Sequence, residues 1–210
     1  MRKDSRPRVP KMVNPYYGFD VVAIGASAGG LHALTEALRS LPQSFPCSIV
    51  VVQHISPRHK SMMPQLLARA SNIKVKAAQH GEIMLPGWAY MAPPDEHLLV
   101  GPGKLQLAHS QLVHFSRPSI DLLFESVAGT YASRSIGVIL SGSGSDGAAG
   151  LRTIKEAGGT TVAQSPADSE FPSMPEAALE TGCVDYTLPL REIGATLTRL
   201  CCGETGRRAK

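Results

Sequence analysis

Three polar residues, each placed shortly after an apolar run, could together form a hydrolytic site. Ser27 follows VVAIG, His54 follows VVVQ, and Asp146 lies in a glycine-rich loop after VIL. A serine hydroxyl attacks a carbonyl carbon when a histidine removes its proton, and a buried carboxylate orients that histidine and stabilises its cation. These residue types predict nucleophilic hydrolysis of an ester or amide, with Ser27 as nucleophile, His54 as general base and Asp146 as the partner of the base.

The serine lies in GASAG (25–29), which matches the G-x-S-x-G elbow. Small flanking residues let the chain turn sharply from a strand into a helix, and the turn exposes the serine oxygen. Backbone N–H groups at the start of that helix, from Ala28 and Gly29, can then stabilise an oxyanion. Taken alone, the pattern is equally compatible with a packing turn or a phosphate-binding loop.

To converge, the three residues must be placed by strands of one sheet. Short apolar runs rich in β-branched residues predict buried strands at 19–25, 48–53, 135–140 and 160–164, and a predicted helix follows each. This alternation predicts a three-layer α/β fold with a mostly parallel, doubly wound sheet. Between 74 and 109 the pattern changes to short strands with turns, which predicts an antiparallel hairpin at the sheet edge. Because parallel strands end at a common edge, where such sheets bind ligands, the three loops should meet there.

Two of the candidate positions have competing interpretations. His97, in APPDEH, is an alternative general base. It begins a hairpin strand, however, so we interpret Asp95 and His97 as loop-shaping or pocket-lining groups. Asp146 taken alone would be an ordinary helix N-cap. Its place after a strand that should end at the same sheet edge favours the catalytic interpretation.

Length and charge predict a single domain with two polar ends. The 210 residues, 43% of them hydrophobic, suit one core. The net charge of +4 is concentrated at the ends, because 1–17 holds five basic residues against one acidic and 203–210 holds three against one. We therefore predict a basic flexible arm (1–17), a catalytic domain (18–202) and a polar tail (203–210). The body has no basic stripe with interleaved aromatic residues, so nucleic-acid binding is not expected.

The cysteines and the hydropathy predict a cytoplasmic protein. The sequence contains no CxxC pair, no cysteine and histidine spacing suited to zinc, and no run of 18 apolar residues. An apolar block behind the N-terminal charges, as a signal peptide needs, is also missing. We expect neither a metal site nor insertion into a membrane. The cysteines are interpreted as buried or idle thiols: Cys47, Cys183, Cys201 and Cys202.

The whole series of motifs resembles the chemotaxis-type protein-glutamate methylesterases (CheB-like), which remove methyl groups from glutamate side chains of bacterial chemoreceptors. The resemblance runs from about Asp20 to Leu200, with the motifs in family order and at family-like spacing. It rests on VVAIGASAGG, VVQH, MAPPDEHLLV, SRPSIDLLFESVA, VILSGSGSDGAAGLRTIKEAGG and VAQSPADSEFPSMPEAA. The order Ser…His…Asp also differs from the order in α/β-hydrolases and in the two large serine-protease groups.

The resemblance implies a reaction, a substrate and a set of site residues. A serine hydrolase would release methanol from glutamate γ-methyl esters on cytoplasmic chemoreceptor helices, without metal or organic cofactor, and glutamine deamidation by the same site is a related activity. The triad would be the three residues named above. The resemblance further implies an oxyanion site and cleft that include Ser143, Gly144 and Met174.

Two departures from the family pattern bear on activity and control. The family usually has threonine after the nucleophile and methionine in the middle of the aspartate loop, where this chain has Ala28 and Ser143. Backbone donors survive both changes, but the help of a threonine side chain is lost. Well-known members also carry an N-terminal receiver domain, where only the basic arm precedes the first strand here. We expect control by a separate response regulator, or constant activity, or that this sequence is a piece of a longer protein.

Two other classes of function stay open from the sequence. A catalytically impaired member of the family could act as a receptor-bound scaffold, as Ala28 and Ser143 suggest. Alternatively, GASAGG and SGSGSDGAAG could bind phosphates or a nucleotide at helix N-termini. The dinucleotide version is weak, because serine occupies the second glycine position of G-x-G-x-x-G in the first loop.

Overall fold

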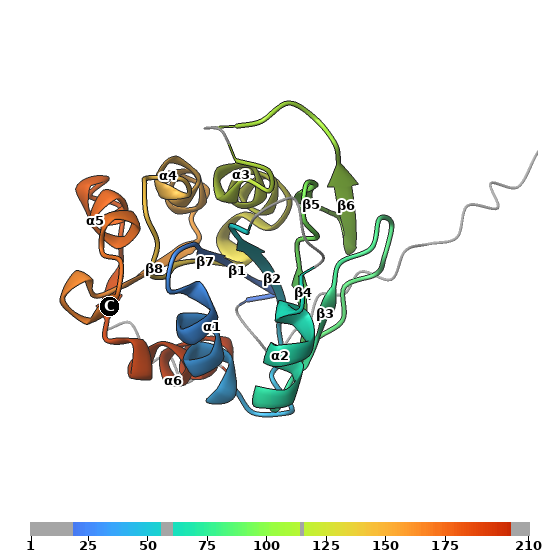
Figure 1. The fold of residues 1–210 in the computed structure, drawn as a ribbon, viewed down its shortest axis with the longest axis horizontal. Helices are drawn as coiled ribbons and strands as arrows, with labels where there is room; N and C mark the ends of the chain where they lie inside the picture. The colour runs from blue at the N-terminus through green and yellow to red at the C-terminus, as the bar shows by residue number, and fades with distance from the viewer. Residues whose placement is uncertain (1–18, 56–60, 114–115, 203–210) are drawn as a thin grey trace, which may run out of the picture.

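A computed structural model describes residues 19–55, 61–113 and 116–202. The predicted arm (1–17) and tail (203–210) lie outside these described residues. The centre of the fold is a seven-stranded sheet in which all paired strands are parallel (Figure 1). Its strands are β1 (Val21–Ala26), β2 (Ser48–Gln53), β3 (Lys74–Ala77), β4 (Trp88–Met91), β7 (Ser135–Ile139), β8 (Thr160–Gln164) and β9 (Tyr186–Leu188). The order β3-β4-β2-β1-β7-β8-β9 places β1 in the middle of the sheet, so the chain winds outward from it in both directions.

Helices cover both faces of this sheet, which confirms the predicted three-layer α/β fold (Figure 1). One face carries α1 (Gly30–Arg39), α2 (Met63–Ala70) and α6 (Leu190–Cys201). The other carries α3 (Ile120–Tyr131), α4 (Ala148–Glu156) and α5 (Ser173–Glu180). Two short 3₁₀ helices are η1 (Ala132–Arg134) and η2 (Pro166–Asp168). Because side chains alternate along a strand, β1 directs Val22 and Ile24 to the first face and Val21 and Ala23 to the second.

The predicted antiparallel hairpin is present, but its expected place at the edge of the large sheet needs correction. β5 (His97–Gly101) and β6 (Lys104–Ala108) form a two-stranded sheet of their own. Their outer hydrogen-bonding groups already have other partners. Leu105 N–H donates to Glu82 O (2.8 Å), and Val100 N–H donates to the Ser126 hydroxyl of α3 (3.0 Å). The hairpin therefore packs against a loop and a helix, and the parallel strands β3 and β9 form the sheet edges.

The strand register brings the predicted site residues to one edge of the sheet. Ala26 of β1 is the register partner of Gln53 of β2, so Ser27 and His54 are the next residues on adjacent strands. On the other side of β1, Gly25 is the partner of Ile139, after which β7 ends and the aspartate loop begins. Adjacent strands lie about 4.8 Å apart. The loops that carry Ser27, His54 and Asp146 thus begin next to one another, at the ends of three neighbouring strands.

Candidate active site

Ser27 is held by contacts from the end of β2 and from the loop after β7. Its N–H donates to Ser141 O (3.0 Å), and its carbonyl accepts a hydrogen bond from the Gln53 side-chain amide (2.6 Å). Gly29, the N-cap of α1, has φ of 72°, a left-handed conformation that glycine adopts without strain. The elbow therefore turns directly from β1 into α1, with the serine at the turn.

His54 is half-buried at the end of β2 and is oriented from both sides. Its backbone N–H donates to Ala26 O (3.0 Å), and its Nε2 lies 2.8 Å from Asp146 Oδ2. A carboxylate only accepts hydrogen bonds, so this contact assigns the ring proton to Nε2 and leaves Nδ1 as a proton acceptor. The ring is thus in the tautomer that a general base needs.

Asp146 is almost entirely enclosed, with an exposed fraction of 7%, and donors surround its carboxylate. Besides His54, it accepts hydrogen bonds from the N–H groups of Ile120 (2.8 Å) and Asp121 (3.0 Å) and from the Ser119 hydroxyl (3.1 Å). Burial opposes ionisation of Asp146, but the hydrogen bonds from His54 and from the start of α3 outweigh it and lower the pKa below its usual value. Asp146 is therefore an anion beside the imidazole at neutral pH.

Backbone donors suited to an oxyanion lie next to the serine. Within the described part of the chain, the N–H groups of Ala28, Gly29 and Ser143 donate to no other protein group. The N–H of Gly144, by contrast, already donates to the Ser173 hydroxyl (3.1 Å). Ala28, Gly29 and Ser143 are therefore the better candidates for oxyanion donors, and neither departure from the family pattern removes a backbone donor.

Met174 lies against the aspartate loop beside the serine. It is 1% exposed, and its N–H donates to Gly142 O (3.0 Å). A Cβ built on Gly142 would lie 2.1 Å from Met174 Sδ and 2.9 Å from Ser27 Cβ, so this position has no room for a side chain. Met174 is thus packed against Gly142 in the core beneath the aspartate loop, close to the nucleophile, and it does not line the pocket described next.

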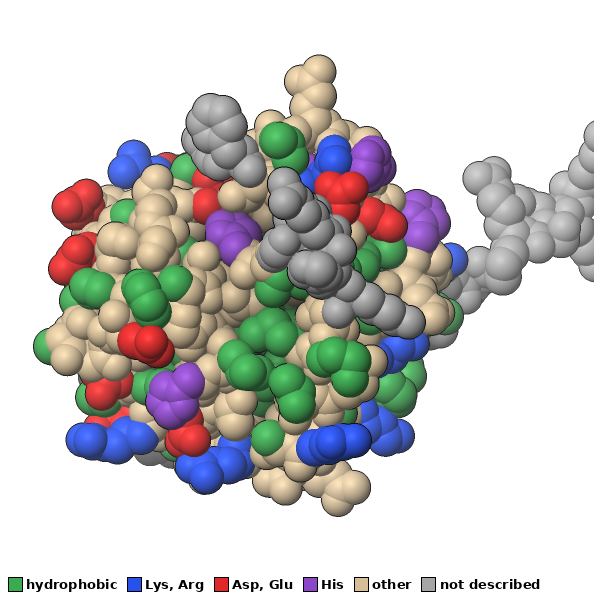
Figure 2. All heavy atoms as spheres, in the orientation of Figure 1, with side chains coloured by type: hydrophobic (Ala, Val, Ile, Leu, Met, Phe, Trp, Pro, Cys, Tyr) green, Lys and Arg blue, Asp and Glu red, His purple; other side chains and the backbone are tan. Residues whose placement is uncertain are grey.

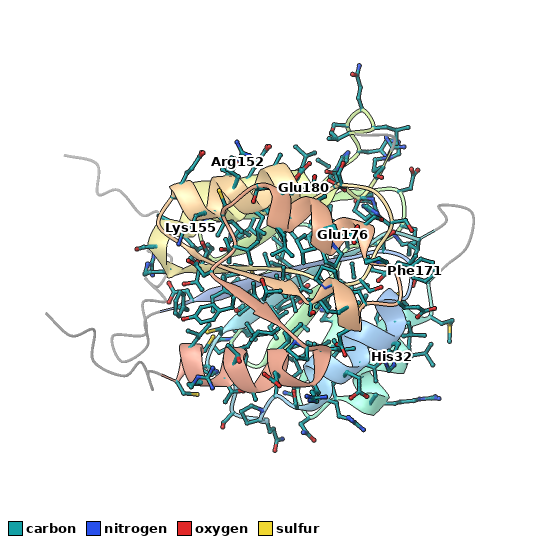
Figure 3. All side chains as sticks on the ribbon, turned by 90° about the vertical axis from the view of Figure 1, so that its left-hand side faces the viewer. His32, Arg152, Lys155, Phe171, Glu176 and Glu180 are labelled. Carbon is teal, nitrogen blue, oxygen red and sulfur yellow. The ribbon has the colours of Figure 1, made fainter. Side chains whose placement is uncertain are left out.

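An open pocket of about 530 Å³ lies over the serine. Figure 2 shows hydrophobic side chains gathered over α1 and α2 in the middle of the face that holds it. Leu31 of α1 and Leu66 of α2 are about half exposed, at 40% and 45%. In Figure 3, His32 at the start of α1 and Phe171 ahead of α5 lie at the same end of the molecule. The pocket is lined by Ser27, Gly29, Gly30, Leu31, His32, Gln53, Met63 and Glu170.

His97, the alternative base, lies behind this site. It is fully buried; its Nδ1 accepts the N–H of Ser119 (3.1 Å), and its Nε2 donates to Gln111 O (3.0 Å). Both ring nitrogens are therefore committed to backbone groups. Asp95 pairs with Arg117 at 2.7 Å, and the Arg117 guanidinium holds the pKa of that carboxyl below its usual value. The two residues shape the loop before α3, as interpreted from the sequence.

Several supporting residues were not singled out from the sequence. Gln53 and Ser141 hold the backbone of the elbow, and Asp121 contacts the loop of Asp146. Ser119 caps α3, where its hydroxyl oxygen accepts the N–H of Leu122 (3.4 Å), and the same hydroxyl donates to Asp146. The sequence signal that could have found them was position, because each ends a strand, follows a strand or opens a helix at the catalytic edge. Their contacts depend on the three-dimensional arrangement of the loops.

No helix among the described residues is long and apolar enough to cross a bilayer.

Known proteins resemble this chain over most of its length. Residues 22–197 match the CheB methylesterase family. A relative from Leptospira interrogans is 43% identical over 183 residues, which cover 87% of this chain and 95% of that protein. Protein-glutamate methylesterase/protein-glutamine glutaminase 2 of Anaeromyxobacter dehalogenans is 45% identical over 86% of this chain, and protein-glutamate methylesterase FrzG of Myxococcus xanthus is 40% identical over 91%. The matches cover 53% and 58% of those two longer proteins.

A solved structure shares the fold. The crystal structure of the Thermotoga maritima CheB methylesterase catalytic domain superposes with a TM-score of 0.83 at 36% sequence identity, and the match covers 87% of this chain and 98% of that one. The resemblance inferred from the motifs is thereby confirmed. The chain belongs to the CheB methylesterase family.

Proposed function

We propose that this chain is a protein-glutamate methylesterase that hydrolyses glutamate γ-methyl esters of chemoreceptors and releases methanol. Relatives that share 40–45% of its residues carry that activity in their names. The observation that carries the catalytic assignment is the 2.8 Å contact between His54 Nε2 and Asp146 Oδ2, on a strand end adjacent to that of Ser27. This arrangement has the parts of a serine-esterase triad.

In the proposed reaction His54 acts first as a base and then as an acid. Nδ1 of His54 takes the proton of the Ser27 hydroxyl as its oxygen attacks the ester carbonyl, and Asp146 stabilises the imidazolium. The tetrahedral oxyanion is stabilised by backbone N–H groups near Ala28 and Ser143. The imidazolium then protonates the leaving methoxide, and methanol departs from an acyl-enzyme. A water molecule, deprotonated by His54, releases the receptor glutamate and restores the serine.

A second activity of the same site is deamidation of glutamine. The Anaeromyxobacter dehalogenans relative is named as a protein-glutamine glutaminase as well as a methylesterase. The attack and the acyl-enzyme are the same, but the leaving group is ammonia instead of methanol. Since an amide is less reactive than an ester, we propose deamidation as the slower of the two activities.

The substrate we propose is a cytoplasmic receptor helix. Leu31 and Met63 line the pocket of Ser27, and Leu66 is exposed on the same helix as Met63. Apolar side chains beside a nucleophile favour a substrate that brings apolar surface of its own. We further propose a cytoplasmic location and a response regulator as a further partner.

Methanol release from methylated receptors tests this function. Membranes that carry radiolabelled methyl esters are incubated with the full chain and with Ser27→Ala. Ser145→Ala, an exposed serine of the aspartate loop, is the matched control. The wild type and Ser145→Ala should release labelled methanol, and Ser27→Ala should release none above background. Release by Ser27→Ala at the wild-type rate would refute the mechanism. No release by any of the three, with the proteins folded, would favour the receptor-bound scaffold.

A further inference from the structure

Asp121 is a buried carboxyl group for which the mechanism above has no role. It lies in the first turn of α3 and is 4% exposed. Its Oδ1 accepts hydrogen bonds from the N–H groups of Gly147 (2.9 Å) and Gly150 (2.7 Å). Gly147 is the N-cap of α4 and directly follows Asp146. Asp121 therefore binds the amino end of the helix that begins just after Asp146.

The relation between the two helices is reciprocal. Asp146, which precedes α4, accepts the N–H groups of Ile120 and Asp121 at the start of α3. Asp121, which belongs to α3, accepts two N–H groups at the start of α4. The first N–H groups of a helix have no partner within the helix, and their dipoles favour a negative charge. Asp146 thus caps α3, the helix that contains Asp121, and Asp121 caps α4, the helix that follows Asp146.

These hydrogen bonds fix the loop of Asp146, whose glycines allow many backbone conformations. The loop of Asp146 contains Gly144 and Gly147, whose φ angles of 92° and 99° lie where glycine is favoured. Its first half is tied to its neighbours by Gly142 N–H, which donates to Phe171 O (2.9 Å). After Asp146, the anchor is Asp121. A shift at this end would move the Asp146 carboxylate away from His54.

The helices α3 and α4 approach each other closely at Gly150. A Cβ built on Gly150 would lie 2.9 Å from both Cα and O of Asp121, so any side chain there would push α4 away from α3. The absence of a side chain lets the Gly150 N–H reach Asp121.

Electrostatics distinguish the two carboxyl groups. Burial raises the pKa of Asp121, its hydrogen bond from Gly150 partly offsets this, and the nearby charge of Asp146 raises it further. The pKa of Asp146 is lowered instead. The negative charge of the pair is therefore favoured on Asp146, the member that faces His54.

We propose that Asp121 is a positioning residue for the catalytic aspartate: by binding the Gly147 and Gly150 N–H groups it holds Asp146 at hydrogen-bonding distance from His54. This proposal rests on the proposed function, because it assigns Asp121 to the same triad. It concerns a geometric role, since Asp121 touches neither Ser27 nor His54 among the contacts described above.

The test compares three variants of the full chain. Asp121→Ala removes the oxygen that accepts the N–H groups of Gly147 and Gly150. Asp121→Asn keeps an oxygen for these two N–H groups and removes the charge. Asp185→Ala is the matched control, because Asp185 accepts the N–H of Thr161 (3.0 Å) and pairs with Lys155. Figure 3 shows Lys155 at the end of the molecule opposite Phe171 and His32. The measurements are kcat and KM for methyl-ester hydrolysis, thermal unfolding, and the proton resonance of the His54 Nε2–H bond in NMR spectra.

Asp121→Ala should lower kcat about 10²-fold, the size of effect that a 1 Å displacement of a catalytic group can have, with KM nearly unchanged. It should also shift or abolish the downfield His54 proton. Asp121→Asn should restore most of the activity, and Asp185→Ala should lose stability without losing turnover or the resonance. If Asp121→Ala does not fold, Gly150→Ala replaces it and should lower kcat in the same way.

The proposal is overturned if Asp121→Ala, or Gly150→Ala in its place, keeps kcat and the resonance of the wild type. Failure of the proposed function has a different signature. In that case the wild type itself releases no more methanol than Ser27→Ala, while the His54 resonance still reports on the role of Asp121.

Discussion

Replacing Asp146 with asparagine should lower kcat about 10⁴-fold, the loss seen when a triad aspartate becomes asparagine in a serine protease. The structure gives the reason. Four donors point at the carboxylate: His54 Nε2, Ile120 N, Asp121 N and Ser119 Oγ, at 2.8, 2.8, 3.0 and 3.1 Å. An asparagine amide has one oxygen, so two of these donors must face an NH₂ group. Neither orientation of the amide stabilises the His54 cation as a carboxylate does.

The same substitution should reduce stability, because either orientation leaves one backbone N–H without an acceptor. The N–H of Ile120 loses its acceptor in one orientation and that of Asp121 in the other. A buried donor without a partner costs about 1–3 kcal/mol. Urea unfolding at pH 7 measures this loss, and Asp185→Asn, away from the site, is the matched control.

The pH dependence of unfolding gives an independent check. Because the folded-state pKa of Asp146 is lower than the unfolded value, its stabilisation is fully present above the ordinary aspartate pKa of about 3.9 and is lost as the pH falls through the lower folded-state pKa. The wild type should thus lose free energy of unfolding on acidification below about pH 4, and Asp146→Asn should lose less. Wild-type turnover in Asp146→Asn, or identical acid profiles of the two proteins, would refute the assignment of Asp146.

Four other substitutions give further predictions. Gly142→Ala should lower kcat about 10²-fold, because its Cβ would lie 2.1 Å from Met174 Sδ and 2.9 Å from Ser27 Cβ, whereas Gly129→Ala, with open space and an exposed helical position, should leave kcat unchanged and raise stability by about 1 kcal/mol. Ala28→Thr restores the hydroxyl that relatives usually have and should raise kcat about threefold or more in the methanol assay; a lower kcat would show that this hydroxyl has no place here. Asp121→Asn should raise the free energy of unfolding at pH 7, since a raised folded-state pKa makes the ionised form destabilising above the unfolded pKa. The gain should shrink as the pH falls through the raised folded-state pKa and should vanish below about pH 4. A loss of stability at pH 7 would contradict it.

The sequence predicts the parallel part of the fold well, because strands buried on both faces have a distinctive pattern. The runs at 48–53 and 160–164 coincide with β2 and β8, and 19–25 differs from β1 by only a few residues at its ends. Strands of this kind are apolar throughout and end at glycines or polar residues. The three triad candidates could be placed at one edge for the same reason.

The hairpin and the supporting contacts were harder to predict. Alternation along β5 and β6 indicates an antiparallel pair but not its neighbour, which is decided by contacts of Glu82 and Ser126 with the hairpin. Likewise, the sequence gives Asp121 as one more polar residue in a helical first turn. Its relation to Gly150 arises from the packing of α3 on α4, which no local pattern encodes.

Labelling with a fluorophosphonate probe tests the central claim most directly, because the probe reacts only with an activated serine. The purified full chain, Ser27→Ala, His54→Ala and Ser145→Ala are treated in parallel, and the modified residue is located by mass spectrometry. The account predicts labelling of Ser27 in the wild type and in Ser145→Ala, and none in the other two variants. A folded wild type that takes up no label, or label at Ser27 that persists without His54, would contradict the proposed catalytic site.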